Sequence, residues 1–380
     1  SDGLVDHFTY VIAGDGCLME GVSHEAASLA GHMGLGRLIV LFDDNGISID
    51  GSTNLAVSDD TTARFEAYGW QVLAVDGHDM DAVSAAIAAA KADTGKPSLI
   101  RCKTVIGYGA PKKAGSSAVH GAPLGGEEIS RTRAALGWDH APFEIPAEIM
   151  ANWRDVGSRG SAARATWQAR HDELDTGDFD KAMQGDWDRE IEEAVRQWKA
   201  SLAAEPLTIA TRVASQKAIE AILPACPAMF GGSADLTGSN NTKVGSQSVF
   251  DRKNFNGTYV HYGVREHGMA AAMNGIALHG GVIPYGGTFM VFTDYCRPSI
   301  RLSALMGQRA IYVMTHDSIG LGEDGPTHQP VEHLAALRVI PNLLVFRPGD
   351  AVETAEAWQC AIEAAKTPSI LALSRQAIAQ

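Results

Sequence analysis

Short apolar runs alternate with helical patterns along most of this sequence. In its first part, the predicted strands and helices are residues 8–13, 20–33, 38–42, 70–75, 79–92 and 98–104. A later region repeats the order, with predicted strands near Met229 and at 282–285, 310–315, 343–346 and 369–374. This alternation is typical of a parallel sheet with helices on both faces. Because the runs are apolar throughout, rather than at every second residue, we expect both faces of each sheet to be covered.

Two segments interrupt the alternation. Residues 105–126 contain six glycines and no hydrophobic period, and a loop of that length in a compact domain is usually functional or disordered. Residues 139–205 are polar, with a charged helical stretch at 186–199. We therefore predict an α/β fold class with two doubly wound, mainly parallel-sheet domains. Their predicted bounds are 1–140 and 207–380, joined by a helical linker at 141–206.

The charge balance excludes several classes of partner. The chain has 31 Lys and Arg against 45 Asp and Glu, a net charge of −14, whereas nucleic acids and anionic membranes require a basic face. An anionic substrate must then be held by locally placed cations. The five cysteines form no CxxC pair, which argues against a disulfide framework or zinc site. With no apolar run of ~18 residues and no secretory signal pattern at the first residues, we expect a cytoplasmic enzyme.

Two glycine-containing motifs follow predicted strands. Gly14-Asp15-Gly16 comes after the first strand, and Asp44-Asn45-Gly46 comes after the second. Ligands of open α/β sheets bind at the carboxyl ends of the strands, where Asp and Asn oxygens suit Mg²⁺ or Ca²⁺. Such an ion can bridge a diphosphate, and a helix N-terminus also favours the anion. The alternative is two tight turns; the paired placement favours the ligand interpretation.

The longer motifs resemble the transketolase family of thiamine-diphosphate enzymes. They are GDGCLMEGVSHEAASLAG, DDNGISIDG, HGAPLG, GGSADL, HYGVREHGM, THDSIGLGEDGPTHQP and LSRQ. The matches run in order from Tyr10 to Gln376, apart from the predicted linker. The resemblance implies a diphosphate-binding first domain, N-terminally incomplete, and a pyrimidine-binding second domain. It also implies that a further segment precedes Ser1 and that a third domain follows Gln380, so that the isolated chain is expected to turn over poorly.

For the first domain, the resemblance implies one metal and cofactor site. Asp15, Asn45 and the backbone carbonyl of Ile47 would coordinate Mg²⁺ or Ca²⁺. Gly16 would contact the diphosphate, and Glu20 would link the cofactor sites across a dimer. The sequence departs from many other thiamine enzymes in having Asp-Asp-Asn here rather than a pair of asparagines.

A second motif places Glu266 at the start of a predicted helix. Thiamine diphosphate must lose a proton from its C2 atom, and a carboxyl group that shares a proton with pyrimidine N1′ assists this step. Such a carboxyl group requires a dry site. The alternative is a surface pair of Arg265 and Glu266 favoured by the helix dipole. The small residues that follow, including Gly268 and Ala271, favour a buried helix, and the resemblance makes Glu266 catalytic.

A third motif contains three aromatic residues at intervals of three. Phe289, Phe292 and Tyr295 would lie on adjoining faces of one helix. From their spacing alone, core packing is the simpler interpretation. The resemblance instead makes them the wall of the aminopyrimidine pocket, with Phe292 stacked on the ring.

The remaining candidates are polar residues predicted near strand ends: His120, Arg212, Asp235, Ser239, His316, Asp324, His328 and Arg375. The resemblance makes Arg212, Ser239, His316 and Arg375 a clamp for the sugar phosphate. Asp324 would sense the configuration of the donor's C2 hydroxyl group, and Asp235 would lie near the thiazolium. His328 would hydrogen-bond the donor and His120 would lie near the diphosphate and reacting carbonyl, both in catalytic roles.

The predicted function is that of a transketolase. Such an enzyme transfers a two-carbon ketol group from a ketose phosphate, such as xylulose 5-phosphate, to an aldose phosphate, such as ribose 5-phosphate, in the pentose phosphate pathway. The resemblance also implies a homodimer with active sites at the subunit interface. Alternatives are dihydroxyacetone synthase, deoxyxylulose-phosphate synthase, and a homologue that binds thiamine diphosphate without turnover.

Overall fold

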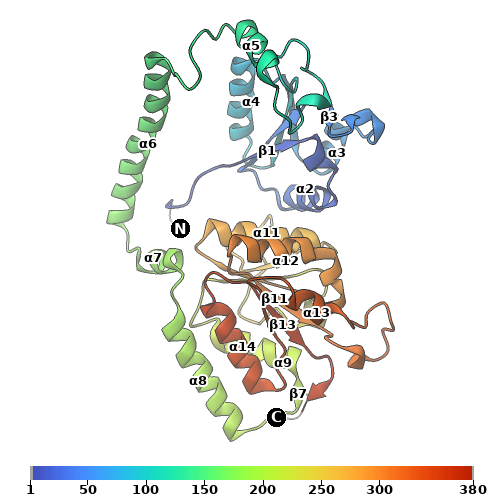
Figure 1. The fold of residues 1–380 in the computed structure, drawn as a ribbon. Coiled ribbons are helices and arrows are strands. Elements are labelled where there is room, and N and C mark those ends of the chain that lie inside the picture. The colour runs from blue at the N-terminus through green and yellow to red at the C-terminus, as the bar shows by residue number, and fades with distance from the viewer. Residues whose placement is uncertain (1–2, 379–380) are drawn as a thin grey trace. The chain divides into compact units, whose positions relative to one another are not determined.

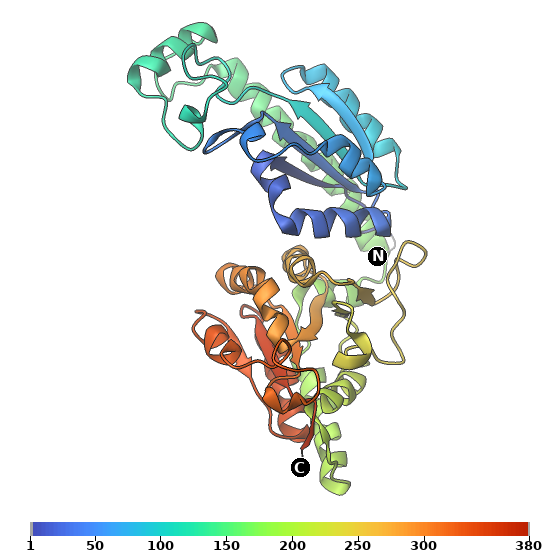
Figure 2. The same cartoon turned by 90° about the vertical axis from the view of Figure 1, so that its right-hand side faces the viewer.

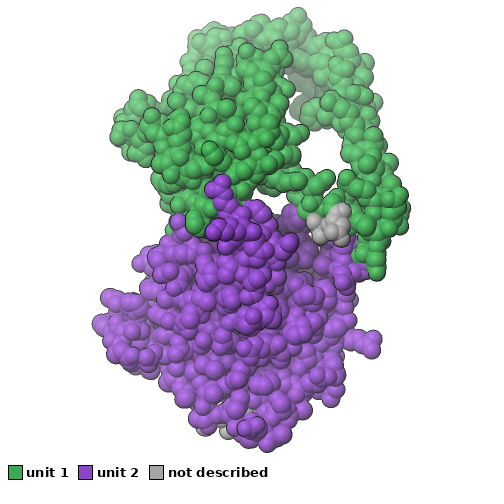
Figure 3. Space-filling view, turned by 180° about the vertical axis from the view of Figure 1, so that it is seen from behind, with its two compact units in different colours: residues 1–176 green, residues 177–380 purple. Residues whose placement is uncertain are grey.

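The computed structural model describes residues 3–378, which divide after Thr176 into two compact units (Figure 3). The elements of the first unit are β1 (Thr9–Gly14), α1 (Asp15–Met19), α2 (Gly21–Met33), β2 (Leu38–Asp44), β3 (Ile47–Ser48), β4 (Gly51–Ser52), α3 (Thr61–Ala67), β5 (Gln71–Asp76), α4 (Met80–Ala92), β6 (Ser98–Lys103), α5 (Gly126–Ala135) and α6 (Ala147–Glu173). Short 3₁₀ turns at Thr53–Leu55 and Ser117–Val119 lie in its loops.

A four-stranded parallel sheet, in the order β1-β2-β6-β5, forms the centre of this unit (Figure 1). One apolar cluster joins the sheet to α2 and α3 through residues such as Ala27 and Phe65, and a second joins it to α4 through Ala86 and Ala90. The indole N–H of Trp70 donates to the carbonyl oxygen of Ala27 at 2.8 Å. The sheet is therefore covered on both faces, as its uniformly apolar strands predict.

The second unit contains the elements α7 (Gly177–Gln184), α8 (Asp188–Ala204), β7 (Ile209–Ala210), α9 (Thr211–Ile222), β8 (Met229–Ser233), α10 (Thr237–Asn240), β9 (Tyr259–His261), α11 (Glu266–His279), β10 (Ile283–Phe289), α12 (Thr293–Met306), β11 (Ile311–Thr315), α13 (His333–Arg338), β12 (Leu344–Phe346), α14 (Ala351–Glu363), β13 (Ser369–Leu373) and β14 (Ala377–Ile378). Its six-stranded sheet has the order β12-β13-β11-β10-β8-β9, and every pairing in it is parallel.

Helices cover both faces of this larger sheet (Figures 1 and 2). The main core joins α8, α9 and α14 to the strands, with Ile191, Ile219 and Trp358 almost fully buried. On the other side, α11 packs against β10 and α12. The indole N–H of Trp358 donates to the hydroxyl oxygen of Ser215 at 2.8 Å, which satisfies the polar atom of a buried ring.

The predicted α/β fold class with two doubly wound domains is confirmed. The 141–206 segment consists mainly of α6, α7 and α8. Among the described residues of α6 none is buried, whereas α8 buries Ile191, Val195 and Leu202 in the core of the second unit. The two units divide after Thr176, within that segment.

In residues 3–378, no helix has both the length and the hydropathy needed to cross a bilayer.

Candidate functional site

The carboxyl ends of β1 and β2 bring together the two glycine-containing motifs of the first unit. These strands pair in parallel with Gly14 opposite Asp43, so Asp15 and Asn45 emerge side by side. The carboxylate of Asp15 accepts a hydrogen bond from the backbone N–H of Gly46 at 3.1 Å. The amide oxygen of Asn45 accepts from the N–H of Ile47 at 3.0 Å. The close placement of the predicted ligands therefore follows from strand register.

A hollow of about 830 Å³ opens at this edge. Five of the predicted residues line it: Asp15, Gly16, Asn45, Ile47 and His120. His120 reaches it from the long glycine-containing loop after β6. Glu20 is exposed at the boundary between α1 and α2, and its role between cofactor sites stays a prediction.

The electrostatics of the hollow suit a divalent cation. Burial raises the pKa of Asp15, and the nearby charge of Asp44 raises it further, against the hydrogen bond from Gly46. An ionised Asp15 is therefore costly until a cation compensates its charge. Carboxylate, amide and carbonyl oxygens are the ligands that Mg²⁺ and Ca²⁺ prefer. The residues present thus fit the implied ion.

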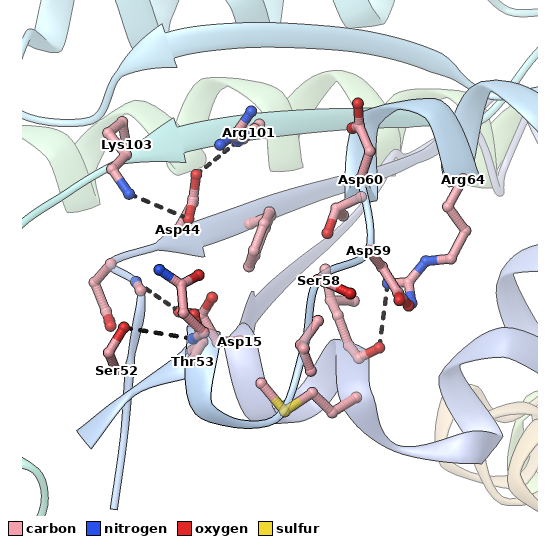
Figure 4. Close-up of a pocket in the computed structure, with 18 of the residues that line it drawn as sticks. Asp15, Asp44, Ser52, Thr53, Ser58, Asp59, Asp60, Arg64, Arg101 and Lys103 are labelled. Atoms are coloured by element: carbon pink, nitrogen blue, oxygen red, sulfur yellow. Dashed lines mark hydrogen bonds and ion pairs between the residues drawn. The ribbon is translucent and has the colours of Figure 1, made fainter. Parts of the chain in front are cut away.

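A second hollow of about 650 Å³ also includes Asp15 and Asn45 in its lining and is rich in charged side chains (Figure 4). Asp44 lies between Arg101, whose Nε is 2.6 Å from Oδ2, and Lys103, whose Nζ is 3.4 Å from Oδ1. Sequence reasoning missed these two cations. The sequence does contain a signal for them: Arg101 and Lys103 are two residues apart in a largely apolar strand, so their side chains lie on the same face of β6.

In the second unit, aromatic rings gather at the carboxyl end of β10. Phe289 stacks on His316 with ring centroids 3.8 Å apart, and on Phe292 at 5.7 Å with the planes 7° apart. The ring of His328 meets Phe292 edge-on at 5.4 Å. Three predicted binding residues and one predicted catalytic residue thus form one cluster.

The prediction that Phe289, Phe292 and Tyr295 lie on one helix is wrong. Phe289 ends β10, Phe292 lies in the 3₁₀ turn Met290–Phe292, and Tyr295 belongs to α12. Strand β10 extends this far because all seven of its residues are buried between β8 and β11. Phe292 and Tyr295 still contact each other at 5.8 Å, although Tyr295 is 63% exposed.

The predicted cations meet next to this aromatic cluster. β7 pairs with β14, which brings the start of α9 to the end of β13 and so Arg212 close to Arg375. Burial lowers the pKa of Arg212, and the charge of Arg375 lowers it further. Arg212 donates to the carbonyl oxygen of Ser239 at 2.6 Å, and Arg375 pairs with Glu323 at 2.6 Å. Two positive charges held this close repel each other, and a bound anion would offset the repulsion further than Glu323 does alone.

The remaining candidates also follow strands. Glu266 begins α11 and is 7% exposed, so the alternative of a surface Arg265–Glu266 pair is excluded. Asp235 follows β8, and His316 follows β11. Both have the left-handed backbone conformation, with φ of 62° and 58°. Non-glycine residues in this region are uncommon and concentrate at functional sites. Asp324 acts electrostatically on His316 from the loop after β11.

Both units match models of one enzyme family. Residues 1–194 match the transketolase thiamine diphosphate binding domain, and residues 208–380 match the transketolase pyrimidine binding domain. This chain belongs to the transketolase family. The resemblance predicted from the sequence motifs is thereby confirmed.

Named transketolases match the chain over almost its whole length. The transketolase of Cereibacter sphaeroides is 60% identical over 376 residues, which are 99% of this chain and 57% of the relative. A transketolase structure from Leishmania mexicana has a TM-score of 0.92 and 43% identity, covering 100% of this chain and 57% of that one. A Pichia stipitis transketolase solved with sedoheptulose 7-phosphate has a TM-score of 0.89, 42% identity and the same coverage. The chain thus spans a little over half the length of these relatives.

In this transketolase-family chain, we expect His316 to make the free energy of unfolding depend on pH. Burial, followed by the charge of Arg212, lowers the pKa of His316 from 6.5 to about 4. At a pH between these two pKa values, His316 of the unfolded chain binds a proton and the buried His316 of the native chain does not. The free energy of unfolding therefore decreases as the pH falls from 6.5 to 4, and His316 does not reduce it above pH 6.5. His316→Gln should lose this dependence. Urea unfolding of both proteins at several pH values measures it; a parent-minus-variant difference that stays constant with pH would contradict the assignment.

Proposed function

We propose that this chain provides the cofactor and substrate sites of a transketolase. The reaction is the transfer of a two-carbon ketol group from a ketose phosphate, such as xylulose 5-phosphate, to an aldose phosphate, such as ribose 5-phosphate. The observation that carries the proposal is that the chain contains both a cluster of oxygen ligands suited to a metal, at the carboxyl ends of the strands of one unit, and an aromatic and cationic cluster in the other unit. We further propose a cytoplasmic enzyme of the pentose phosphate pathway.

Each set of residues has a distinct role in this proposal. Asp15, Asn45 and the Ile47 carbonyl would hold Mg²⁺ or Ca²⁺, and Gly16 would leave room for the diphosphate. Phe289, Phe292 and Tyr295 would hold the pyrimidine, with Asp235 beside the thiazolium. Bound thiamine diphosphate supplies the nucleophilic carbon and accepts the electron pair released when the ketose carbon–carbon bond breaks.

The protein's own contribution is proton placement and orientation. Glu266 is buried at the start of α11, which supports a role inside a closed site, where its carboxyl group would share a proton with the pyrimidine. His316 is neutral at pH 7 and can therefore donate to or accept from a sugar oxygen. His328 and His120 would contact the reacting part of the donor, and Asp324 would accept from its hydroxyl group. The close pair Arg212 and Arg375, with Ser239, would bind the phosphate.

The proposed active assembly is a homodimer. Metal-binding candidates lie in the first unit, whereas Glu266 and the cationic pair lie in the second. In the proposed arrangement, the first unit of one subunit and the second unit of its partner build each active site, and Glu20 links the two sites. Sedimentation of the purified chain with and without thiamine diphosphate and Mg²⁺ measures the assembly.

A steady-state assay tests the proposed reaction. The purified chain is supplied with xylulose 5-phosphate and ribose 5-phosphate, with and without thiamine diphosphate and Mg²⁺. Formation of sedoheptulose 7-phosphate that requires the cofactor supports the proposal. Formaldehyde as acceptor distinguishes dihydroxyacetone synthase, and pyruvate as donor distinguishes deoxyxylulose-phosphate synthase. Tight cofactor binding with no product from any pair would instead support a homologue that binds without turnover.

Arg375→Ala should raise KM for phosphorylated sugars far more than KM for hydroxypyruvate, which has no phosphate. A guanidinium pairs with phosphate oxygens through two parallel hydrogen bonds, and the small donor never makes this contact. Glu323→Gln is the matched control, because it removes the ion-pair partner of Arg375 and leaves the cation. That variant should keep or lower the KM for phosphorylated sugars. Equal effects of Arg375→Ala on both donors would exclude the clamp role.

A further inference from the structure

Three potential metal ligands meet where α13 approaches α12. Asp294 lies in the first turn of α12, Glu332 caps α13, and His333 is the first residue of α13. His333 Nε2 is 3.3 Å from Oδ2 of Asp294, and its Nδ1 is 3.9 Å from Oε2 of Glu332. One ligand atom from each residue lies within 4.8 Å of the other two. Small side-chain rotations would bring these atoms around one ion.

Within the part of the chain that the structure describes, the imidazole of His333 has no hydrogen-bond partner. Its side chain is 5% exposed, and among residues 3–378 no group forms a hydrogen bond with either ring nitrogen. Buried polar atoms are normally satisfied, because leaving one unpaired costs free energy. A protonated ring would direct its N–H groups at the carboxylates, yet neither contact has hydrogen-bond geometry. A metal ion bound to one ring nitrogen would satisfy that nitrogen and offset the charge of both carboxylates.

The donor set selects a class of ion. We propose that Asp294, Glu332 and His333 bind a divalent first-row transition metal, with Zn²⁺ as the preferred ion. Imidazole with carboxylates suits Zn²⁺ and its neighbours, whereas Mg²⁺ prefers oxygen ligands alone. Two ionised carboxylates balance the charge of the ion. The side chains of Asp294 and Glu332 are 65% and 72% exposed, so the ion has access from solvent and room for water ligands.

The proposed site is separate from the Asp15 cluster, which lies in the other unit and contains oxygen ligands. An ion here would join the start of α12, two residues after Phe292, to α13, five residues after His328. These are the two segments whose aromatic rings meet at 5.4 Å. The ion would therefore hold the loop that carries His328 against the turn that carries Phe292.

Cobalt spectroscopy of the metal-free 380-residue chain tests the site. Titration with Co²⁺ should give visible absorption that saturates at one equivalent, and Zn²⁺ should abolish it while Mg²⁺ in large excess should not. His333→Gln and Asp294→Asn should each weaken Co²⁺ binding at least tenfold. The parent and variants are compared by circular dichroism for folding. If His333→Gln does not fold, Asp294→Asn and Glu332→Gln change exposed residues and decide the outcome.

Two control variants separate this site from other metal ligands. His171→Gln removes a histidine that is 3.5 Å from a carboxylate of Asp172 outside the cluster, and it should bind Co²⁺ as the parent does. Asp15→Asn should also retain the cobalt signal. Binding that is unchanged in His333→Gln and Asp294→Asn would overturn the proposal. So would an intense near-ultraviolet thiolate band as the only signal, because it would assign the ion to cysteine.

Discussion

Replacing Glu266 with glutamine should lower cofactor-dependent turnover by the ~10²–10⁴-fold that loss of a positioned acid–base group typically costs. Glutamine has nearly the same shape, so packing at the start of α11 is preserved, while the proton that the carboxyl group is proposed to share with the cofactor is lost. Glu266 is buried, which excludes a simple surface role. The rate of xylulose 5-phosphate consumption measures the effect, and exchange of the cofactor's C2 proton with deuterium measures it without a sugar.

Glu128 offers the matched control for this experiment. It is also buried, at 6% exposure, and its carboxylate accepts from the backbone N–H groups of Lys112 and Lys113 at 2.7 and 3.1 Å. Glu128→Gln should change stability more than catalysis. Proton exchange in Glu266→Gln within threefold of the parent would show that Glu266 has no catalytic role.

Asp15→Ala should release both the metal ion and thiamine diphosphate. The substitution removes the proposed charged oxygen ligand from the hollow at the end of β1, and the diphosphate would then lose the cation that offsets its charge. The apparent Kd for thiamine diphosphate should rise at least tenfold, and excess Mg²⁺ should restore part of the binding. Quenching of tryptophan fluorescence measures the affinity at several Mg²⁺ concentrations.

Two comparisons sharpen this second experiment. Asp59→Ala removes an acidic residue that lines the neighbouring hollow of Figure 4 and pairs with Arg64 at 3.7 Å. It should leave the affinity for thiamine diphosphate near that of the parent. Removal of divalent ions with EDTA should weaken the parent and Asp59→Ala alike, but should affect Asp15→Ala little. An unchanged affinity in Asp15→Ala would show that the diphosphate site lies elsewhere.

Local sequence was enough to predict the fold class and the positions of most strands. Runs such as 38–42 and 370–373 are apolar at every residue, and that pattern is stable only where both faces of a strand are covered. Turn residues then mark where a strand ends: Asp15 and Asn45 stand directly after β1 and β2. Because carboxyl ends of parallel strands share one edge, the grouping of these two residues was predictable before any contact was known.

The aromatic residues show where local pattern fails. A spacing of three suits a helix, but the burial of β10 between two strands extends it to Phe289, and the chain turns through Phe292 before α12 begins. The stack of Phe289 on His316 joins two different strand ends and has no local signal. Helix α8 also shows the effect of packing: its sequence is highly charged, yet Ile191 and Val195 are buried in the core of the second unit.

Sequence thus determines which residues follow the strands, since turn chemistry and apolar runs act over a few neighbours. Which of those ends become neighbours depends on strand order, and strand order arises from packing between segments far apart in the chain. The pairing of β7 with β14 brings Arg212 to Arg375 across more than 160 residues. The contact of α12 with α13 likewise brings Asp294 to His333, where burial leaves an imidazole without a hydrogen-bond partner among the described residues. Burial and long-range register are properties of the whole fold, and only the tertiary structure decides them.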